Sequence, residues 1–317
     1  MRRIALLTRD CAGVNAAIRA IVRSADAYGI EILGIYRGYQ GLIENDIKLL
    51  DRRSVSGIIN LGGTILKTAR SNAFRTVSGQ HQAVKTIKNN KIDGLIVIGG
   101  NGSLTAGHIL ASKYSIPTIG VPATIDNDIN GINMSIGADT ATNVAMDALD
   151  KIRDTATSLE RIFVVEVMGR DCGYIALQVA LSGGCEEVII PEKRFNIKKI
   201  CEEIVEGNIR GKISWIIIVA EGVAKASEIA EQINQITGLE TREVVLGHIQ
   251  RGGRPTAFDR IIAARYANYA VKMLKSGKSD KCVALENEKL SLIPLAKAIK
   301  PKDIKVDAYY KLIKILT

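Results

Sequence analysis

Gly94-Leu95-Ile96-Val97-Ile98-Gly99-Gly100-Asn101-Gly102-Ser103 is the stretch that decides the fold. Its first half is a continuous run of Leu, Ile and Val, which is typical of a strand buried on both faces of a parallel sheet. Its second half is a glycine-rich turn followed by a helical pattern. Such a turn lets the backbone approach a phosphate, and the start of the helix supplies N–H groups and partial positive charge. A plain glycine turn is the alternative interpretation.

Strand-like runs alternate with helix-like runs along the rest of the chain. Apolar β-rich runs occur at 4–8, 31–36, 94–98, 118–122, 162–168, 187–190, 215–220 and 244–249, and helical patterns at 139–157, 197–205, 224–236 and 257–274. Asp139 suits the N-cap of the first of these helices. The repetition predicts an α/β fold with two doubly wound, mostly parallel sheets and ligands in the cleft between them.

Composition narrows the functional classes. Of the 317 residues, 47% are apolar and 24% charged, and no apolar run approaches a membrane span of about 20 residues. The net charge is +10, but the lysines are dispersed and aromatic residues make up only 4%, so we expect no nucleic-acid partner. The basic start followed by a short apolar run favours a first strand over a signal peptide. Five cysteines without a CxxC pair suit reduced thiols, so we expect a cytoplasmic protein without a membrane anchor.

Three further motifs follow predicted strands. They are Pro122-Ala123-Thr124-Ile125-Asp126-Asn127-Asp128, Glu166-Val167-Met168-Gly169-Arg170-Asp171-Cys172-Gly173 and Gly247-His248-Ile249-Gln250-Arg251-Gly252-Gly253-Arg254. The first offers two carboxylates at i and i+2 for deprotonating a hydroxyl or approaching a cation, although a solvated loop is the alternative. The other two offer arginines and a histidine suited to a phosphate monoester. Together with the glycine turn they predict phosphoryl transfer to a phosphorylated, hydroxyl-bearing acceptor, without a Walker A or protein-kinase signature.

These motifs resemble the signatures of the bacterial 6-phosphofructokinases, and the resemblance covers nearly the whole chain. Supporting matches are Asn15-Ala16-Ala17-Ile18-Arg19, Gly34-Ile35-Tyr36 and Gly183-Gly184-Cys185-Glu186. The resemblance implies transfer of the γ-phosphoryl group of ATP to the 1-hydroxyl of fructose 6-phosphate. It also implies a nucleotide-binding domain at 1–137 plus 256–300 and a sugar-phosphate-binding domain at 138–255 plus 301–317.

The resemblance implies a role for each site residue. Asp126 matches the proton acceptor, flanked by Thr124 and Asp128, and Arg170 would steady the phosphoryl charge. The implied substrate-binding residues are Thr124, Ile125, Asp126, Arg161, Met168, Gly169, Arg170, Glu221, Arg242, His248 and Arg251. Within this set His248 and Arg251 would grip the 6-phosphate. Arg161 and Arg242 match arginines that reach a neighbouring subunit's site, which implies a homotetramer.

On the donor side the resemblance implies ATP with Mg²⁺. The matching residues are Arg70, Ser71, Gly100, Asn101, Gly102 and Ser103, with Tyr39, Phe74 and Arg75 near the nucleotide. Members that use pyrophosphate carry an acidic residue in place of Gly102 and a lysine in place of Ala123. Neither change is present, so we expect ATP to be the donor.

An effector site for ADP or phosphoenolpyruvate is also implied. Its residues would be Arg19, Arg23, Arg52, Arg153, Gly184, Glu186, Arg210 and Lys212, with Glu186 binding a metal. Ordinary surface charges are the alternative, and the match weakens at Ile213 and Ser214.

Two departures concern the nucleotide. The family has Thr-Ser-Gly-Gly-Asp-Ala-Pro-Gly after its first strand, whereas this chain reads Thr8-Arg9-Asp10-Cys11-Ala12-Gly13 and is two residues shorter. The family also has Asp as a magnesium ligand where this chain has Asn101. An amide oxygen can bind a metal but adds no charge. A catalytically weakened paralogue that acts as a sugar-phosphate-binding regulatory subunit is therefore the alternative to an active kinase.

Overall fold

The computed structural model describes all 317 residues. The chain divides into two compact units, which are described separately. The first unit contains Met1–Thr140 and Arg251–Lys302, and the second contains Ala141–Gln250 and Asp303–Thr317. The nucleotide-binding and sugar-phosphate-binding roles that the sequence assigns to 1–137 plus 256–300 and to 138–255 plus 301–317 stay predictions.

The first unit is built on a seven-stranded sheet in the order β11-β10-β5-β4-β1-β2-β3. The five inner strands run parallel, and the two outer strands, β11 and β3, pair antiparallel with their neighbours. The strands are β1 (Arg3–Thr8), β2 (Glu31–Ile35), β3 (Ile47–Leu50), β4 (Gly94–Gly99), β5 (Thr118–Pro122), β10 (Lys281–Glu286) and β11 (Lys289–Pro294). The chain leaves β1 and β4 toward opposite sides of the sheet, which makes their carboxyl ends a topological switch point.

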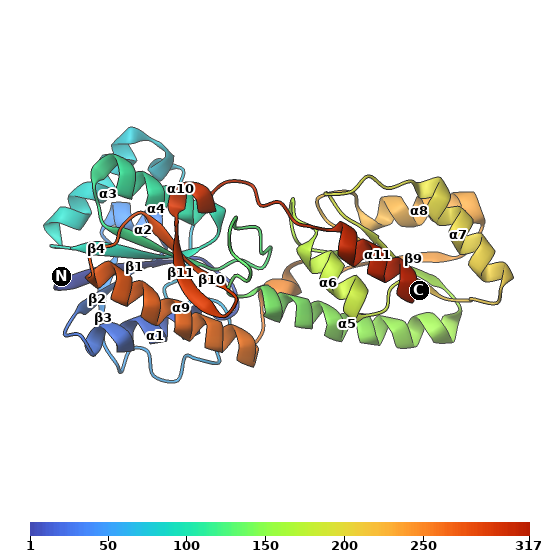
Figure 1. Cartoon of the computed structure of the whole chain (residues 1–317), viewed down its shortest axis with the longest axis horizontal. Helices are drawn as coiled ribbons and strands as arrows, with labels where there is room; N and C mark the ends of the chain where they lie inside the picture. The colour runs from blue at the N-terminus through green and yellow to red at the C-terminus, as the bar shows by residue number, and fades with distance from the viewer. The chain divides into compact units, whose positions relative to one another are not determined.

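Helices cover both faces of this sheet (Figure 1). One face carries α1 (Val14–Asp26) and α9 (Ala257–Lys275), and the other carries α2 (Tyr39–Glu44), α3 (Val77–Asn89) and α4 (Asn101–Tyr114). The short elements are η1 (Ala73–Arg75) and α10 (Leu295–Ala298). Every residue of β4 and β5 is buried, as expected for continuous apolar strands inside a parallel sheet.

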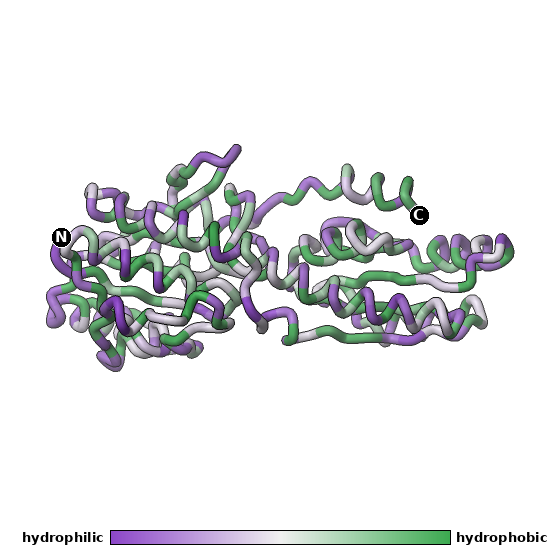
Figure 2. Tube along the Cα trace, turned by 90° about the horizontal axis from the view of Figure 1, so that it is seen from below, coloured by the Kyte–Doolittle hydropathy of each residue, from purple (hydrophilic) through white to green (hydrophobic).

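The second unit has a four-stranded, wholly parallel sheet in the order β7-β8-β6-β9. Its strands are β6 (Ile162–Val167), β7 (Glu187–Ile189), β8 (Trp215–Ala220) and β9 (Thr241–Val245). Its helices are α5 (Ala138–Leu159, from Ala141 onward), α6 (Tyr174–Ser182), α7 (Ile197–Ile209), α8 (Ala226–Thr237) and α11 (Asp307–Leu316), with the 3-10 helix η2 (Gly247–Arg251). Figure 2 shows long hydrophobic stretches of the trace in this unit. The core of this unit is formed where α7 and α8 pack on β6 and β8.

The C-terminal helix α11 docks onto this unit through a buried carboxylate. Glu187 is 4% exposed and accepts hydrogen bonds from Tyr310 Oη and Lys314 Nζ, each at 2.7 Å. Lys314 also donates to Glu203 at 2.7 Å. Burial opposes the charge of Lys314, but its hydrogen bonds to Glu187 and Glu203 raise the pKa of the ammonium group. A buried carboxylate thus fixes the last helix beside β7.

The α/β class with two mostly parallel sheets is confirmed, and two local predictions need correction. The strand predicted at 244–249 lies earlier in the chain, because β9 covers Thr241–Val245 and Gly247, with φ of 53°, starts the 3-10 helix η2. Asp139 does not cap α5, since the helix already begins at Ala138. The Asp139 carboxylate instead accepts a hydrogen bond from Thr256 Oγ1 at 2.6 Å. None of the helices is long and apolar enough to cross a membrane.

Candidate functional site

Three neighbouring strands of the first unit end at the same edge. The N–H of Arg9, just after β1, donates to Ile98 of β4 at 3.0 Å, and the N–H of Ala123, just after β5, donates to Gly99 at 3.1 Å. A Cβ atom added to Gly100 would lie 3.2 Å from Thr124 Cβ. The sheet therefore brings together the predicted glycine turn, the Asp-Asn-Asp motif and the turn after β1.

The glycine turn opens α4 as the sequence predicts. Gly100 is the N-cap, and its carbonyl accepts hydrogen bonds from the N–H groups of Ser103 and Leu104 at 3.0 Å each. A Cβ atom added to Gly102 would meet nothing within 4 Å. The first N–H groups of a helix lack partners within it and carry partial positive charge. The turn thus combines a positive helix end with open space beside Gly102, which suits an anion.

Asp126 lies in a loop that hydrogen bonds fix at several points. It is 4% exposed, its N–H donates to Thr124 Oγ1 at 3.3 Å, and that hydroxyl lies 3.4 Å from Asp126 Oδ2. Ser135 Oγ donates to the Thr124 carbonyl at 2.7 Å, and Asn127 Oδ1 accepts the N–H of Ser135 at 2.9 Å. Lys302 Nζ donates to the Asn127 carbonyl at 2.8 Å. The neighbouring Ile125 is fully buried, so its side chain belongs to the core.

Asn101 and Asp128 form an oxygen-rich pair at the same edge. Asn101 Nδ2 donates to Asp128 Oδ2 at 2.8 Å. The other side-chain oxygens, Asn101 Oδ1 and Asp128 Oδ1, are buried and have no hydrogen-bond partner. Buried polar atoms without a partner are rare and costly, so the two oxygens suit a hard cation. No group of three or more His, Cys, Asp or Glu side chains is placed to hold a metal ion.

The turn after β1 directs Arg9 toward the 64–70 segment. Arg9 Nη1 donates to Thr68 Oγ1 at 3.0 Å and to the Ala69 carbonyl at 3.2 Å. The next two residues are Arg70, which is exposed, and Ser71, whose hydroxyl donates to Gln40 at 2.8 Å. The predicted donor-side residues Arg70 and Ser71 thus come directly after Thr68 and Ala69, the two residues that Arg9 holds.

In the second unit, three of the predicted sugar-side residues, Gly169, Arg170 and Glu221, meet at the carboxyl ends of β6 and β8. Glu221 Oε1 accepts the N–H groups of Gly169 at 3.4 Å and Arg170 at 3.1 Å. Gly169 has φ of 147° and Arg170 φ of 55°, both in the left-handed region. A Cβ atom added to Gly222 would lie 1.8 Å from the Arg170 carbonyl oxygen, so the two strand ends are in close contact.

Gln250 is a positioning residue to which the sequence argument gave no role. It is fully buried, its Oε1 accepts the N–H of Met168 at 3.3 Å, and its Nε2 donates to Gly247 at 3.2 Å. It therefore joins η2, which contains His248 and Arg251, to the end of β6. No sequence signal marks this role, because the burial of Gln250 and its contact with Met168 are visible only in the fold.

Arg161 and Arg242 lie at the opposite end of the same sheet. Arg161 directly precedes β6, and Arg242 is the second residue of β9. Glu240 joins them, with Oε2 at 2.8 Å from Arg161 Nε and Oε1 at 2.5 Å from Arg242 Nη2. Desolvation acts against the charge, but the hydrogen bonds from Arg242 and Arg161 lower the pKa of Glu240. The unit does not bring these arginines to Met168 and Glu221.

Part of the predicted effector set gathers in the second unit. Arg153 donates to the carbonyls of Gly183 and Gly184, the latter at 3.1 Å. Glu186, 7% exposed, pairs with Lys212 at 3.0 Å and accepts the N–H of Ile216 at 2.7 Å. Lys212 Nζ also lies 4.8 Å from the centre of the Trp215 ring. This unit therefore places Arg153, Gly184, Glu186 and Lys212 around the start of β7.

The remaining predicted effector residues are engaged differently. Arg210 is exposed at the C-cap of α7 and pairs with Glu206 at 3.3 Å. In the first unit, Arg19 and Arg23 lie on α1, and Arg52 pairs with Asp26 at 2.9 Å. The buried Nε atom of Arg23 has no hydrogen-bond partner. Each unit thus contributes cations, and their joint action on one effector stays a prediction.

Asp259 is a buried carboxylate that the motif search missed. It is fully buried at the start of α9 and accepts the N–H groups of Gly137 and Thr140, each at 2.8 Å. Burial raises the pKa of Asp259 above its ordinary value of 3.8, although these hydrogen bonds act to lower it. Cys11 is nearby, because a Cβ atom added to Gly137 would lie 2.9 Å from Cys11 Sγ. Burial also raises the pKa of the Cys11 thiol, and Asp259 adds to this effect.

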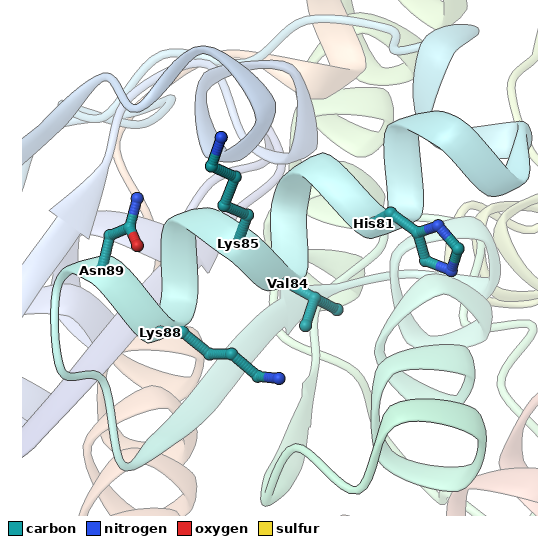
Figure 3. A pocket seen from close by; sticks show the side chains of 5 residues that line it. All are labelled: His81, Val84, Lys85, Lys88 and Asn89. Carbon is teal, nitrogen blue, oxygen red and sulfur yellow. The ribbon is translucent and has the colours of Figure 1, made fainter.

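A surface pocket of about 360 Å³ lies on α3. His81, Val84, Lys85, Lys88 and Asn89 line it (Figure 3). It contains none of the predicted site residues, so the strand ends remain the candidate functional site.

Comparison with known proteins identifies the family of the chain. The phosphofructokinase family model matches residues 3–274. A protein from Clostridium botulinum named ATP-dependent 6-phosphofructokinase is 51% identical over 292 residues, which are 92% of this chain and 91% of that protein. A protein of the same name from Clostridium novyi is 47% identical over 319 residues and the full length of both chains.

Solved structures give the same result for the fold. The phosphofructokinase of Pichia pastoris in the T-state matches with a TM-score of 0.89 and 33% identity over 94% of this chain. This chain spans only 37% of the length of that yeast chain. The pyrophosphate-dependent phosphofructokinase of Marinobacter aquaeolei shares the fold, with a TM-score of 0.84 at 20% identity. On the family match and the extent of the identity, the chain belongs to the phosphofructokinase family.

Proposed function

We propose that this chain transfers the γ-phosphoryl group of ATP to the 1-hydroxyl of fructose 6-phosphate, giving fructose 1,6-bisphosphate and ADP. The observation that carries the proposal is the buried Asp126 carboxylate at the end of β5, next to the glycine turn that opens α4. Relatives at 47% and 51% identity carry the name of this activity.

The donor phosphates would bind at the start of α4. Backbone N–H groups of residues 100–102 and the positive helix end would stabilise anionic oxygens there. The open space beside Gly102 leaves room for a phosphate of the nucleotide. Arg70 and Ser71, which follow the segment held by Arg9, would complete the donor site.

Asp126 would act as the general base. As the sugar oxygen forms its bond to the γ-phosphorus, the bond from phosphorus to the leaving ADP oxygen breaks, and the hydroxyl proton moves to the Asp126 carboxylate. The Thr124 hydroxyl at 3.4 Å orients that carboxylate. Arg170 and the helix end would offset the charge on the transferred group.

The sugar phosphate would bind to the second set of strand ends. Glu221 holds the backbone of Gly169 and Arg170, and a carboxylate has enough lone pairs to accept sugar hydroxyls as well. Met168 and Gly169 would line the sugar, and His248 with Arg251 would bind the 6-phosphate. Arg161 and Arg242 would serve the site of a second copy, as in a homotetramer.

Asn101 and Asp128 are the residues that would hold Mg²⁺. Their unpartnered buried oxygens fit a cation that prefers oxygen ligands, and the nucleotide phosphates and water would supply the other ligands. When bound, Mg²⁺ neutralises charge on the donor phosphates. The hydrogen bond between Asn101 and Asp128 fixes the direction of both side chains.

Regulation and location follow the same family pattern in this proposal. ADP or phosphoenolpyruvate would bind near Arg153 and Lys212, with Glu186 holding a metal. The protein would act in the cytoplasm.

Product formation tests the proposal directly. We expect purified protein to form fructose 1,6-bisphosphate with Mg²⁺ and ATP, and Asp126→Ala and Asp126→Asn to lower kcat by about 10³-fold. A wild type as inert as these variants, yet able to bind fructose 6-phosphate, would establish the regulatory subunit instead. A rate with pyrophosphate above the rate with ATP would overturn the donor assignment.

A further inference from the structure

Arg9 occupies a special position in the first unit. It directly follows β1, and its N–H continues the ladder to β4 by donating to the Ile98 carbonyl at 3.0 Å. These are the two strands from which the chain departs toward opposite sides of the sheet. Ligands of open α/β sheets bind outside the carboxyl ends of strands at such a point.

The side chain of Arg9 crosses the start of the glycine turn. A Cβ atom added to Gly99 would lie 3.0 Å from Arg9 Cγ and 2.7 Å from Ser103 Cβ. The aliphatic part of Arg9 therefore packs where β4 leads into α4. Only glycine at position 99 leaves room for both neighbours.

The guanidinium group is anchored rather than mobile. Arg9 Nη1 donates to Thr68 Oγ1 and to the Ala69 carbonyl, so the group is held beside the residues that lead into Arg70 and Ser71. Arg9 is half-buried, and a half-buried guanidinium is less screened by salt than a surface one. A fixed positive charge thus stands between the glycine turn and the 64–70 segment.

We propose that Arg9 is a binding residue for the phosphate chain of the nucleotide donor. This assignment rests on the proposed use of ATP. A guanidinium group can bind two phosphate oxygens at once, whereas a backbone N–H binds one. AMP lacks the β- and γ-phosphates of the phosphate chain, so Arg9 should strengthen the binding of ATP and ADP more than that of AMP.

Calorimetric titration of ATP, ADP and AMP tests the assignment without depending on catalysis. We expect Arg9→Gln to weaken ATP and ADP at least about 10-fold, which corresponds to about 1.4 kcal/mol, and to leave AMP within about twofold. Arg9→Lys should recover part of the loss because it retains the charge. Arg260→Gln is the matched control, since Arg260 is also half-buried and donates to a backbone carbonyl, that of Pro255 at 2.8 Å.

Other outcomes overturn the assignment. Equal weakening of ATP and AMP by Arg9→Gln would mean that Arg9 only anchors the 64–70 segment. Unchanged or tighter ATP binding by Arg9→Gln would mean that Arg9 does not contact the donor. A wild-type protein that binds no ATP would also overturn the assignment, because Arg9 would then have no nucleotide to bind. If wild type forms no fructose 1,6-bisphosphate but shows Arg9-dependent ATP binding, the proposed function fails and the assignment of Arg9 stands.

Discussion

Two regions at one sheet edge are built in opposite ways. The loop at residues 122–136, called the acceptor loop after its proposed role, is held around Asp126 by hydrogen bonds from Ser135 to Thr124 and Asn127 and from Lys302 to Asn127. The donor edge, residues 8–13 and 99–103, keeps open space at Gly102 and is crossed by one charged side chain, Arg9. General-base catalysis needs one exact geometry, whereas phosphate binding can be met by several arrangements of positive charge. The acceptor loop is therefore the stricter region.

The largest effect on this contrast is expected from filling the donor edge. Gly102→Asp should lower kcat/KM for ATP by about 10²-fold or more, because a carboxylate would enter the open space and repel phosphate oxygens. Gly102→Ala is the control for volume without charge. Steady-state kinetics with ATP and with pyrophosphate would check this, and an unchanged ATP rate would place the phosphates elsewhere.

A smaller effect is expected from loosening the acceptor loop. Ser135→Ala removes the hydrogen bond to the Thr124 carbonyl, a loss of about 1–3 kcal/mol for a buried group. We expect kcat to fall by about 10-fold while KM for ATP stays constant. Ser112→Ala, which removes a hydroxyl bonded to His108 on the exposed side of α4, should change neither value. A rise in KM alone would contradict the division between the two regions.

The smallest effect concerns Asp259, which joins Gly137 and Thr140, just after the acceptor loop, to α9. Its pKa is raised in the folded state, so the folded protein holds this proton more tightly than the unfolded chain does. The contribution of this proton to stability is present below pH 3.8 and is lost as pH rises through the raised pKa.

Denaturant unfolding of wild type and Asp259→Asn across this pH range would measure that contribution. The free energy of unfolding of wild type relative to the variant should fall with rising pH, with an underlying loss in the variant of about 1–3 kcal/mol. The loss arises because an amide N–H₂ would face the donors of Gly137 or Thr140. A difference that grows with pH would show that burial is not the dominant influence on Asp259.

The sequence predicts strands and strand-end motifs well, because continuous Val, Ile and Leu runs report burial on both faces. It fails where the signal is nonlocal. The outer strands β3 and β11 and the inner strand β10 are absent from the predicted set, since they are short or partly exposed. Gln250 and Asp259 act on residues 82 and 122 positions away, so no local pattern reveals their roles. The sequence marks Arg9 only as a departure from the motif of the family that it resembles. Its partners Thr68 and Ala69 are seen only in the fold.

The strand order also constrains how the chain is assembled during synthesis. β10 pairs with β5, although the whole of β6 to β9 lies between them in the chain. The four-stranded sheet uses strands from a single continuous stretch, so it can close while the ribosome has yet to produce β10. The seven-stranded sheet must wait with the edge of β5 uncovered, and an uncovered edge strand is open to wrong pairing. The acceptor loop therefore follows a strand, β5, whose edge stays uncovered until β10 pairs with it.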